Sequence, residues 1–91
     1  MEIKTKELMT ASYKVACVSG DYSIEGNVTL GSNNEVTTLD SCIIQKSGAF
    51  VAGFSLYNKN LNVNYASNID LTEQGIVLGL IDEFKQVSTN N

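Results

Sequence analysis

A stretch of strictly alternating residues constrains the fold of this chain most. Its apolar residues fall on one parity, with Gly26 among them: Tyr22, Ile24, Val28 and Leu30. Polar residues occupy the positions between them. A period of two is typical of a β-strand with one buried face and one solvated face. We therefore expect an antiparallel sheet with a core on one side.

Neighbouring segments continue this pattern. They carry apolar residues of one parity at Tyr13, Val15, Cys17, Phe50, Ala52, Phe54, Leu56, Leu61, Val63 and Tyr65. Turn sequences separate the segments, at Gly20–Asp21, 31–34, Ser47–Gly48 and Asn58–Lys59. The segment from Thr37 to Ile43 fits least well, and we expect a bulge near Asp40. Together these features predict an antiparallel β-meander of about five strands.

Each turn also predicts a register. The expected partners are Cys17 with Ile24, Tyr13 with Val28, Val28 with Thr37, Gly26 with Leu39, Leu39 with Leu56, Ile43 with Ala52, Leu56 with Leu61, and Phe54 with Val63. All four turns place one apolar set on one face. A slip of one residue would move the side chains of a strand to the opposite face.

The last part of the chain changes period. Asp70 and Glu73 have the spacing of a helix capping box. Apolar residues then recur at helical spacing, at Val77, Leu80, Ile81, Phe84 and Val87, and Ile76 and Leu78 widen the stripe. We predict a helix from Asp70 to Val87. The alternative is a further strand over residues 75–81, because this segment is short and apolar.

These elements predict one α+β domain over residues 1–91, with loosely ordered ends at 1–7 and 88–91. Five strands make a sheet roughly 20–25 Å wide, whereas one helix is about 10 Å across. A single C-terminal helix therefore does not cover the sheet. We expect the sheet to curl around the helix, and two copies to share the surfaces left uncovered.

The composition excludes several function classes. The chain has no His and no Arg, and its net charge is -4. Without His, the commonest general base and metal ligand are missing. Without Arg, the chain lacks the side chain that binds phosphate through two parallel hydrogen bonds. We expect no enzyme activity, no cofactor, no metal and no nucleic-acid partner. No apolar run reaches membrane length, and the charged N-terminus lacks a signal sequence. The expected location is the cytoplasm, unless a signal was removed before Met1.

Two pairs of residues are candidate reactive sites. In the predicted register Cys17 lies on the buried face and Cys42 on the opposite face, so we expect free thiols and no disulfide. Glu25 and Asp40 are expected to face each other on the outer side of the sheet. Paired carboxylates serve in acid–base catalysis or cation binding. Two solvated side chains are the favoured interpretation.

The same register predicts an apolar cluster on the outer face, formed by Val18, Cys42, Ile44, Val51 and Ala66. Such clusters mark contact surfaces. Gly75 and Gly79 add a spacing that lets a neighbouring strand, or the helix of a second copy, pack closely on the helix.

We therefore expect a non-enzymatic protein-interaction or assembly module that acts as a homodimer or larger homo-oligomer. The alternative is a carrier of a small apolar ligand, with a cavity between curved sheet and helix lined by Tyr13, Tyr22, Phe54 and Tyr65. An enzyme using Glu25 with Asp40, or Cys42, is disfavoured.

Overall fold

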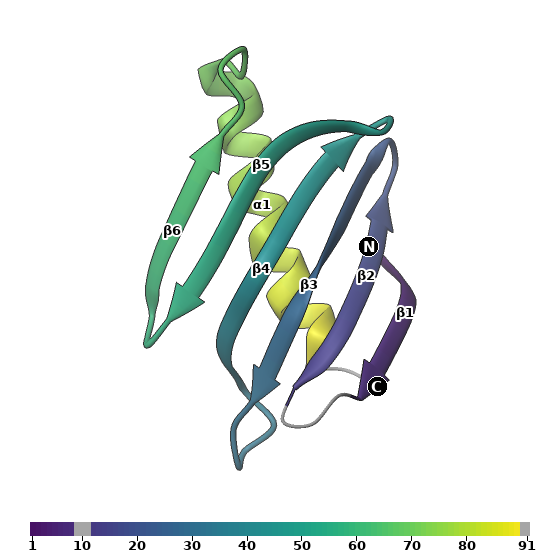
Figure 1. The fold of residues 1–91 in the computed structure, drawn as a ribbon, viewed down its shortest axis with the longest axis vertical. Coiled ribbons are helices and arrows are strands. Elements are labelled where there is room, and N and C mark those ends of the chain that lie inside the picture. The colour runs from purple at the N-terminus through teal and green to yellow at the C-terminus, as the bar shows by residue number, and fades with distance from the viewer. Residues whose placement is uncertain (9–11, 90–91) are drawn as a thin grey trace.

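A computed structural model describes residues 1–8 and 12–89. Six antiparallel strands form one sheet in chain order, and one helix packs on one face of it (Figure 1). The elements are β1 (Glu2–Leu8), β2 (Tyr13–Ser19), β3 (Tyr22–Leu30), β4 (Val36–Lys46), β5 (Ala49–Tyr57), β6 (Asn60–Tyr65) and α1 (Leu71–Ser88). The predicted α+β meander with a C-terminal helix is confirmed, with six strands instead of five. The sheet is not closed.

The extra strand is β1, which occupies the segment predicted as a loose end. It pairs with β2, with Ile3 opposite Cys17 and Lys6 opposite Val15. Lys6 therefore sits at an inward position, where its ammonium group donates to the backbone oxygen of Ser88 at 3.1 Å. At the other end Ser88 closes α1 and Thr89 is its C-cap. Residues 90–91, also predicted to be loose, lie outside the described residues.

Helix α1 begins where the capping pattern predicts. Asp70 is the N-cap, and its carboxylate accepts a hydrogen bond from the backbone N–H of Glu73 at 2.8 Å. The helix buries the predicted stripe against the sheet, namely Val77, Leu80, Ile81 and Phe84, whereas Ile76 and Leu78 remain about half exposed. The helix is therefore favoured over a further strand, because only the helical period gathers these four residues on one face.

Two of the four predicted registers are correct. Cys17 faces Ile24 across the β2–β3 turn, and Phe54 faces Val63 across the β5–β6 turn. The β3–β4 pairing is shifted by two residues. The loop takes in Glu35, whose backbone oxygen accepts from the N–H of Gly31, so that Leu30 faces Val36, and an irregularity at Thr37 adds the second residue. Val28 therefore faces Leu39 instead of Thr37, and Gly26 does not face Leu39. Because the shift at Leu39 is two residues, Leu39 stays on its predicted face.

The β4–β5 pairing is correct only in part. Leu39 faces Leu56 as predicted, but β4 carries one extra residue between Leu39 and Cys42, where Ser41 has φ 54°. This is the bulge predicted near Asp40. Beyond the bulge Ile43 faces Gly53, so the predicted pair of Ile43 with Ala52 is wrong.

The bulge inverts the faces of the rest of β4. Cys42 and Ile44 turn into the core, and Ile43 turns outward. A second irregularity inserts Val51 into β5. It turns Val51 inward and leaves Phe50 outside, 51% exposed.

The helix covers only part of the sheet. It crosses behind the strands in Figure 1 and packs most closely over β2 and β4. The described residues extend 38 × 26 × 18 Å. Strand β6 lies at the edge beyond the helix, which agrees with the predicted mismatch of widths. No helix in the described part of the chain has the length and apolar character that a membrane span requires.

Candidate functional site

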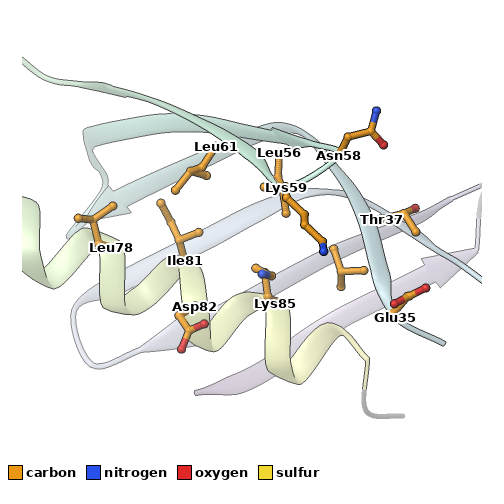
Figure 2. Close-up of a pocket in the computed structure, with 11 residues that line it drawn as sticks. Glu35, Thr37, Leu56, Asn58, Lys59, Leu61, Leu78, Ile81, Asp82 and Lys85 are labelled. Carbon is orange, nitrogen blue, oxygen red and sulfur yellow. The ribbon is translucent and has the colours of Figure 1, made fainter. Parts of the chain in front are cut away.

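The mismatch between sheet and helix opens a groove between α1 and the β4–β6 side of the sheet (Figure 2). We call it the α1–β6 groove. Its volume is about 540 Å³, within the ~300–1,000 Å³ of small-molecule sites. It is lined by Glu35, Val36, Thr37, Leu56, Asn58, Lys59, Leu61, Leu78, Ile81, Asp82 and Lys85.

The floor and walls of the groove are apolar. Leu56 of β5 and Ile81 of α1 are almost fully buried at its base, while Leu61 and Leu78 stand at its sides, 42% and 47% exposed. Leu71 lies two helical turns before Leu78, on the same side of α1, and is 83% exposed. Half-exposed leucines beside a concavity are typical of a surface that receives a partner or ligand.

The rim of the groove carries charges of both signs, with two lysines and two acids among its lining residues. Within residues 1–8 and 12–89, Lys59 and Lys85 have no hydrogen bond or ion pair. The carboxylate of Asp82 accepts from Gln86 at 2.9 Å. Glu35 folds back over its own loop, with Oε1 3.4 Å from the position that a Cβ atom on Gly31 would take. The formal charges of these four side chains therefore balance.

The predicted outer-face cluster does not exist in the predicted form. Cys42, Ile44 and Val51 are buried in the core, because the two strand irregularities turn them inward. Val18 and Ala66 are only half-buried. The outer face carries Ile43 and Phe50 in their place.

The predicted carboxylate pair is also separated. Asp40 faces Asn27, and Glu25 faces Ile43. Asp40 instead accepts a hydrogen bond from the hydroxyl of Tyr57 at 3.0 Å, which raises the pKa of Tyr57. The described residues contain no group of three or more His, Cys, Asp or Glu that is able to hold a metal ion.

Both cysteines are free and buried, so the absence of a disulfide between them is confirmed. The reason given for it was wrong, because both residues belong to the core cluster. Burial, with a smaller contribution from the charge of Asp40, raises the pKa of Cys42 to about 12. Burial likewise raises the pKa of Cys17. A thiol of this kind carries little thiolate at neutral pH.

The two helix glycines lie open to solvent. A Cβ atom on Gly75 or Gly79 would meet nothing within 4 Å. No strand of the described chain therefore packs closely against them. Contact with a second copy stays a prediction.

The groove is not the predicted cavity lined by tyrosines and Phe54. None of its four residues lines the α1–β6 groove. Phe54 fills the core against Phe84, with ring centroids 6.2 Å apart. Tyr13, Tyr22 and Tyr65 are partly buried and pack against that core. The signal available in the sequence was the surplus of apolar residues at Leu61, Leu71 and Leu78. It indicates a groove only once the position of α1 over β2 and β4 is known.

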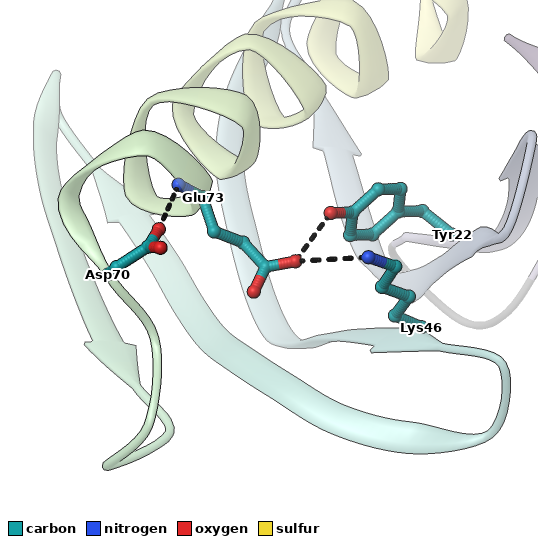
Figure 3. A network of polar contacts seen from close by, with 4 residues as sticks. All are labelled: Tyr22, Lys46, Asp70 and Glu73. Carbon is teal, nitrogen blue, oxygen red and sulfur yellow. Dashed lines mark hydrogen bonds and ion pairs between the residues drawn. The ribbon is translucent and has the colours of Figure 1, made fainter.

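A polar network fixes the N-terminal end of α1 to the sheet (Figure 3). The hydroxyl of Tyr22 donates to the carboxylate of Glu73 at 2.7 Å, and the ammonium of Lys46 lies 3.6 Å from the same oxygen. The carboxylate of Asp70 accepts a hydrogen bond from the backbone N–H of Glu73. The network therefore ties α1 to β3 and β4, and it sets the position of one wall of the groove.

This network predicts a dependence of stability on alkaline pH. The hydrogen bond to Glu73 raises the pKa of Tyr22 to about 12. Folding then favours the neutral phenol, so its contribution is complete below the unfolded pKa of 10.0 and is lost as the pH rises towards 12. We expect the stability difference between wild type and Tyr22→Phe, measured by urea unfolding, to shrink between pH 10 and 12. A difference that stays the same between pH 10 and 12 would contradict the assignment.

Comparison with known proteins gives no relative. The chain matches no model of a known protein family, no curated protein and no solved structure.

Proposed function

We propose that the protein is a non-enzymatic interaction module that assembles into a homo-oligomer through the edge strand β6. The observation that carries this proposal is the contrast between the two edges of the sheet. Edge strands expose unpaired backbone N–H and C=O groups, and monomeric proteins protect them with charges, proline or bulges. Only one of the two edges has such protection.

Strand β1 is the protected edge. Four of its seven residues are charged, at Glu2, Lys4, Lys6 and Glu7, and its register shifts between Ile3 and Thr5. Strand β6 has the sequence NLNVNY, without charge or proline, and pairs with β5 without interruption. It therefore presents a regular, uncharged ladder to a further strand.

Apolar side chains beside β6 support the same proposal. Leu61 and Leu78 are partly exposed at the sides of the groove, and Leu71, two helical turns before Leu78, is exposed as well. A second copy added at β6 would continue the sheet and remove these leucines from water, at roughly 25 cal/mol per Å² of apolar surface. In a two-fold assembly each copy contributes the same patch, so every leucine counts twice.

The test is a charge placed on each edge in turn. We expect the wild-type protein to sediment with at least twice the monomer mass, and Leu61→Glu to raise the dissociation constant more than tenfold, because two carboxylates would be buried at the contact. The matched control is Leu8→Glu, an exposed leucine on β1, which should assemble like the wild type. A wild-type protein that stays monomeric at all concentrations would overturn the proposal.

A second candidate function is carriage of a small apolar ligand, favoured by the volume and apolar lining of the α1–β6 groove. It predicts that a neutral aliphatic molecule such as decanol shifts the methyl resonances of Leu61 and Leu78 in a saturable titration. Unchanged methyl resonances would exclude it.

A further inference from the structure

We infer that β6 pairs with β6 of a second copy in an antiparallel register centred on Val63. This inference rests on the proposed assembly through β6 and adds the geometry of the contact, with a two-fold axis between the two copies of Val63. It follows from the direction of the backbone groups of β6 together with the order of its side chains.

The backbone of β6 offers every second residue to a partner strand. The backbone N–H of Ala66 donates to the oxygen of Val51 in β5 at 2.8 Å. Backbone groups of an antiparallel strand point to its two sides in alternation, so the asparagines of β6 also bond to β5. The N–H and C=O groups of Leu61, Val63 and Tyr65 therefore point to the free edge, since β6 is the last strand of the sheet (Figure 1).

The side chains of β6 determine the orientation of the partner strand. The asparagines in the sequence NLNVNY are exposed, whereas Val63 and Tyr65, of the opposite parity, pack against the core on the face that carries α1. A two-fold axis perpendicular to the sheet places asparagines beside asparagines and apolar residues beside apolar ones. A parallel copy would be turned over and would bring apolar side chains beside asparagines. The alternation therefore favours the antiparallel orientation.

The register follows from the number of backbone bonds that β6 is able to make. Each hydrogen-bonded pair of an antiparallel ladder exchanges two bonds. With Val63 opposite its copy, Leu61 faces Tyr65 of the second copy and Tyr65 faces Leu61. All the outward-pointing residues of β6 are then paired, with about six hydrogen bonds in total.

The turns at both ends of β6 exclude an equally good register on either side. With the centre at Asn62, Tyr65 would face Lys59, whose φ of 71° belongs to the β5–β6 turn. With the centre at Asn64, Leu61 would face Ser67, which lies in a turn. Each of these registers keeps only about four of the six hydrogen bonds.

The register centred on Val63 also matches side chains on both faces. Asn62 faces Asn64 of the second copy in a closely spaced pair, and each carboxamide carries both a donor and an acceptor for the other. On the opposite face the partly exposed Leu61 covers Tyr65 of the second copy. Helix α1 packs over β2 and β4 and leaves this edge open.

The test is disulfide formation between copies that carry a cysteine at Asn62 or at Asn64, both exposed positions. The variants Asn62→Cys and Asn64→Cys are refolded together from urea, oxidised in air and separated by mass. Facing residues of this kind have Cα atoms about 4.5 Å apart, within disulfide range, whereas two copies of Asn62 lie diagonally, roughly 7–8 Å apart. We expect the mixed disulfide to form at least about tenfold faster than the disulfide of either variant alone, because the contact holds the two thiols at a millimolar effective concentration.

Lys14→Cys mixed with Asn64→Cys is the matched control, because Lys14 is an exposed position of β2 away from the β6 edge. It should cross-link only at the background rate. The wild type measures the contribution of Cys17 and Cys42, which are buried.

The outcomes separate the register from the assembly. If Asn62→Cys alone, or Asn64→Cys alone, forms the faster disulfide, the axis lies at that residue, which overturns the inference and leaves assembly through β6 standing. A wild type that sediments as an oligomer while no pair cross-links above background also overturns the inference. A wild type that stays monomeric overturns both the inference and the proposed function.

Discussion

Replacing Gly26 with alanine is expected to lower the free energy of unfolding by about 3 kcal/mol, the upper end for an overpacked core. Gly26 lies in β3 opposite the bulge of β4, and the backbone of β4 approaches it closely there. A Cβ atom on Gly26 would overlap the sulfur of Cys42 and lie 2.9 Å from its Cα atom. This Cα atom belongs to β4, which is hydrogen-bonded to β3 and to β5. It is therefore unable to move away without breaking backbone hydrogen bonds of the sheet.

Gly53→Ala provides the matched control, because Gly53 flanks the same cysteine from β5. Its added Cβ atom would first meet the backbone oxygen of Cys42 at 3.6 Å, an ordinary contact. We expect a change within about 0.5 kcal/mol. Urea unfolding followed by circular dichroism measures both variants. If Gly26→Ala proves as stable as Gly53→Ala, the close approach of β3 and β4 at the bulge is wrong.

Beyond the bulge in β4, the sequence did not predict which residues face the core. The strands, the turns and the helix could be predicted from periodicity. A residue such as Ile24 or Phe84 must be buried, and the residues at strand or helix spacing from it must then be buried on the same face. In the segment Cys42–Ile43–Ile44 both parities are apolar. Periodicity therefore does not distinguish which of them faces the core. The contact between Gly26 and Cys42 decides it, and that contact is visible only in three dimensions.

Strand β1 and the groove escaped prediction for different reasons. In β1 a lysine occupies the inward position at Lys6, where the backbone oxygen of Ser88 accepts a hydrogen bond from its ammonium group. A burial pattern therefore does not appear in the sequence. For the groove, the widths of sheet and helix predicted an uncovered surface. The side on which it opens depends on α1 lying over β2 and β4, which no local pattern determines.

Phe84→Ala is expected to cost about 4 kcal/mol, within the range for a fully buried phenylalanine. Phe84 is 0% exposed and meets Phe54 edge-on in the centre of the core. At roughly 4–8 °C per kcal/mol for a domain of this size, the midpoint of thermal unfolding should fall by about 20 °C. Ile76→Ala is the control, since Ile76 lies on the same helix and is 45% exposed. It should shift the midpoint by only a few degrees, and an equally small shift for Phe84→Ala would contradict the packing of α1.

The Phe84→Ala variant also decides whether α1 is an integral layer of the fold or a separable one. All four tyrosines lie in strands, and the chain has no Trp, so tyrosine fluorescence reports on the sheet while circular dichroism at 222 nm follows the helix. Because Phe84 contacts Phe54 of β5, we expect both signals to melt together at the lowered midpoint. A helix signal that is lost first would mean that the sheet survives without α1. One wall of the α1–β6 groove would then be detachable, and a ligand would enter by displacing the helix instead of by the open side at β6.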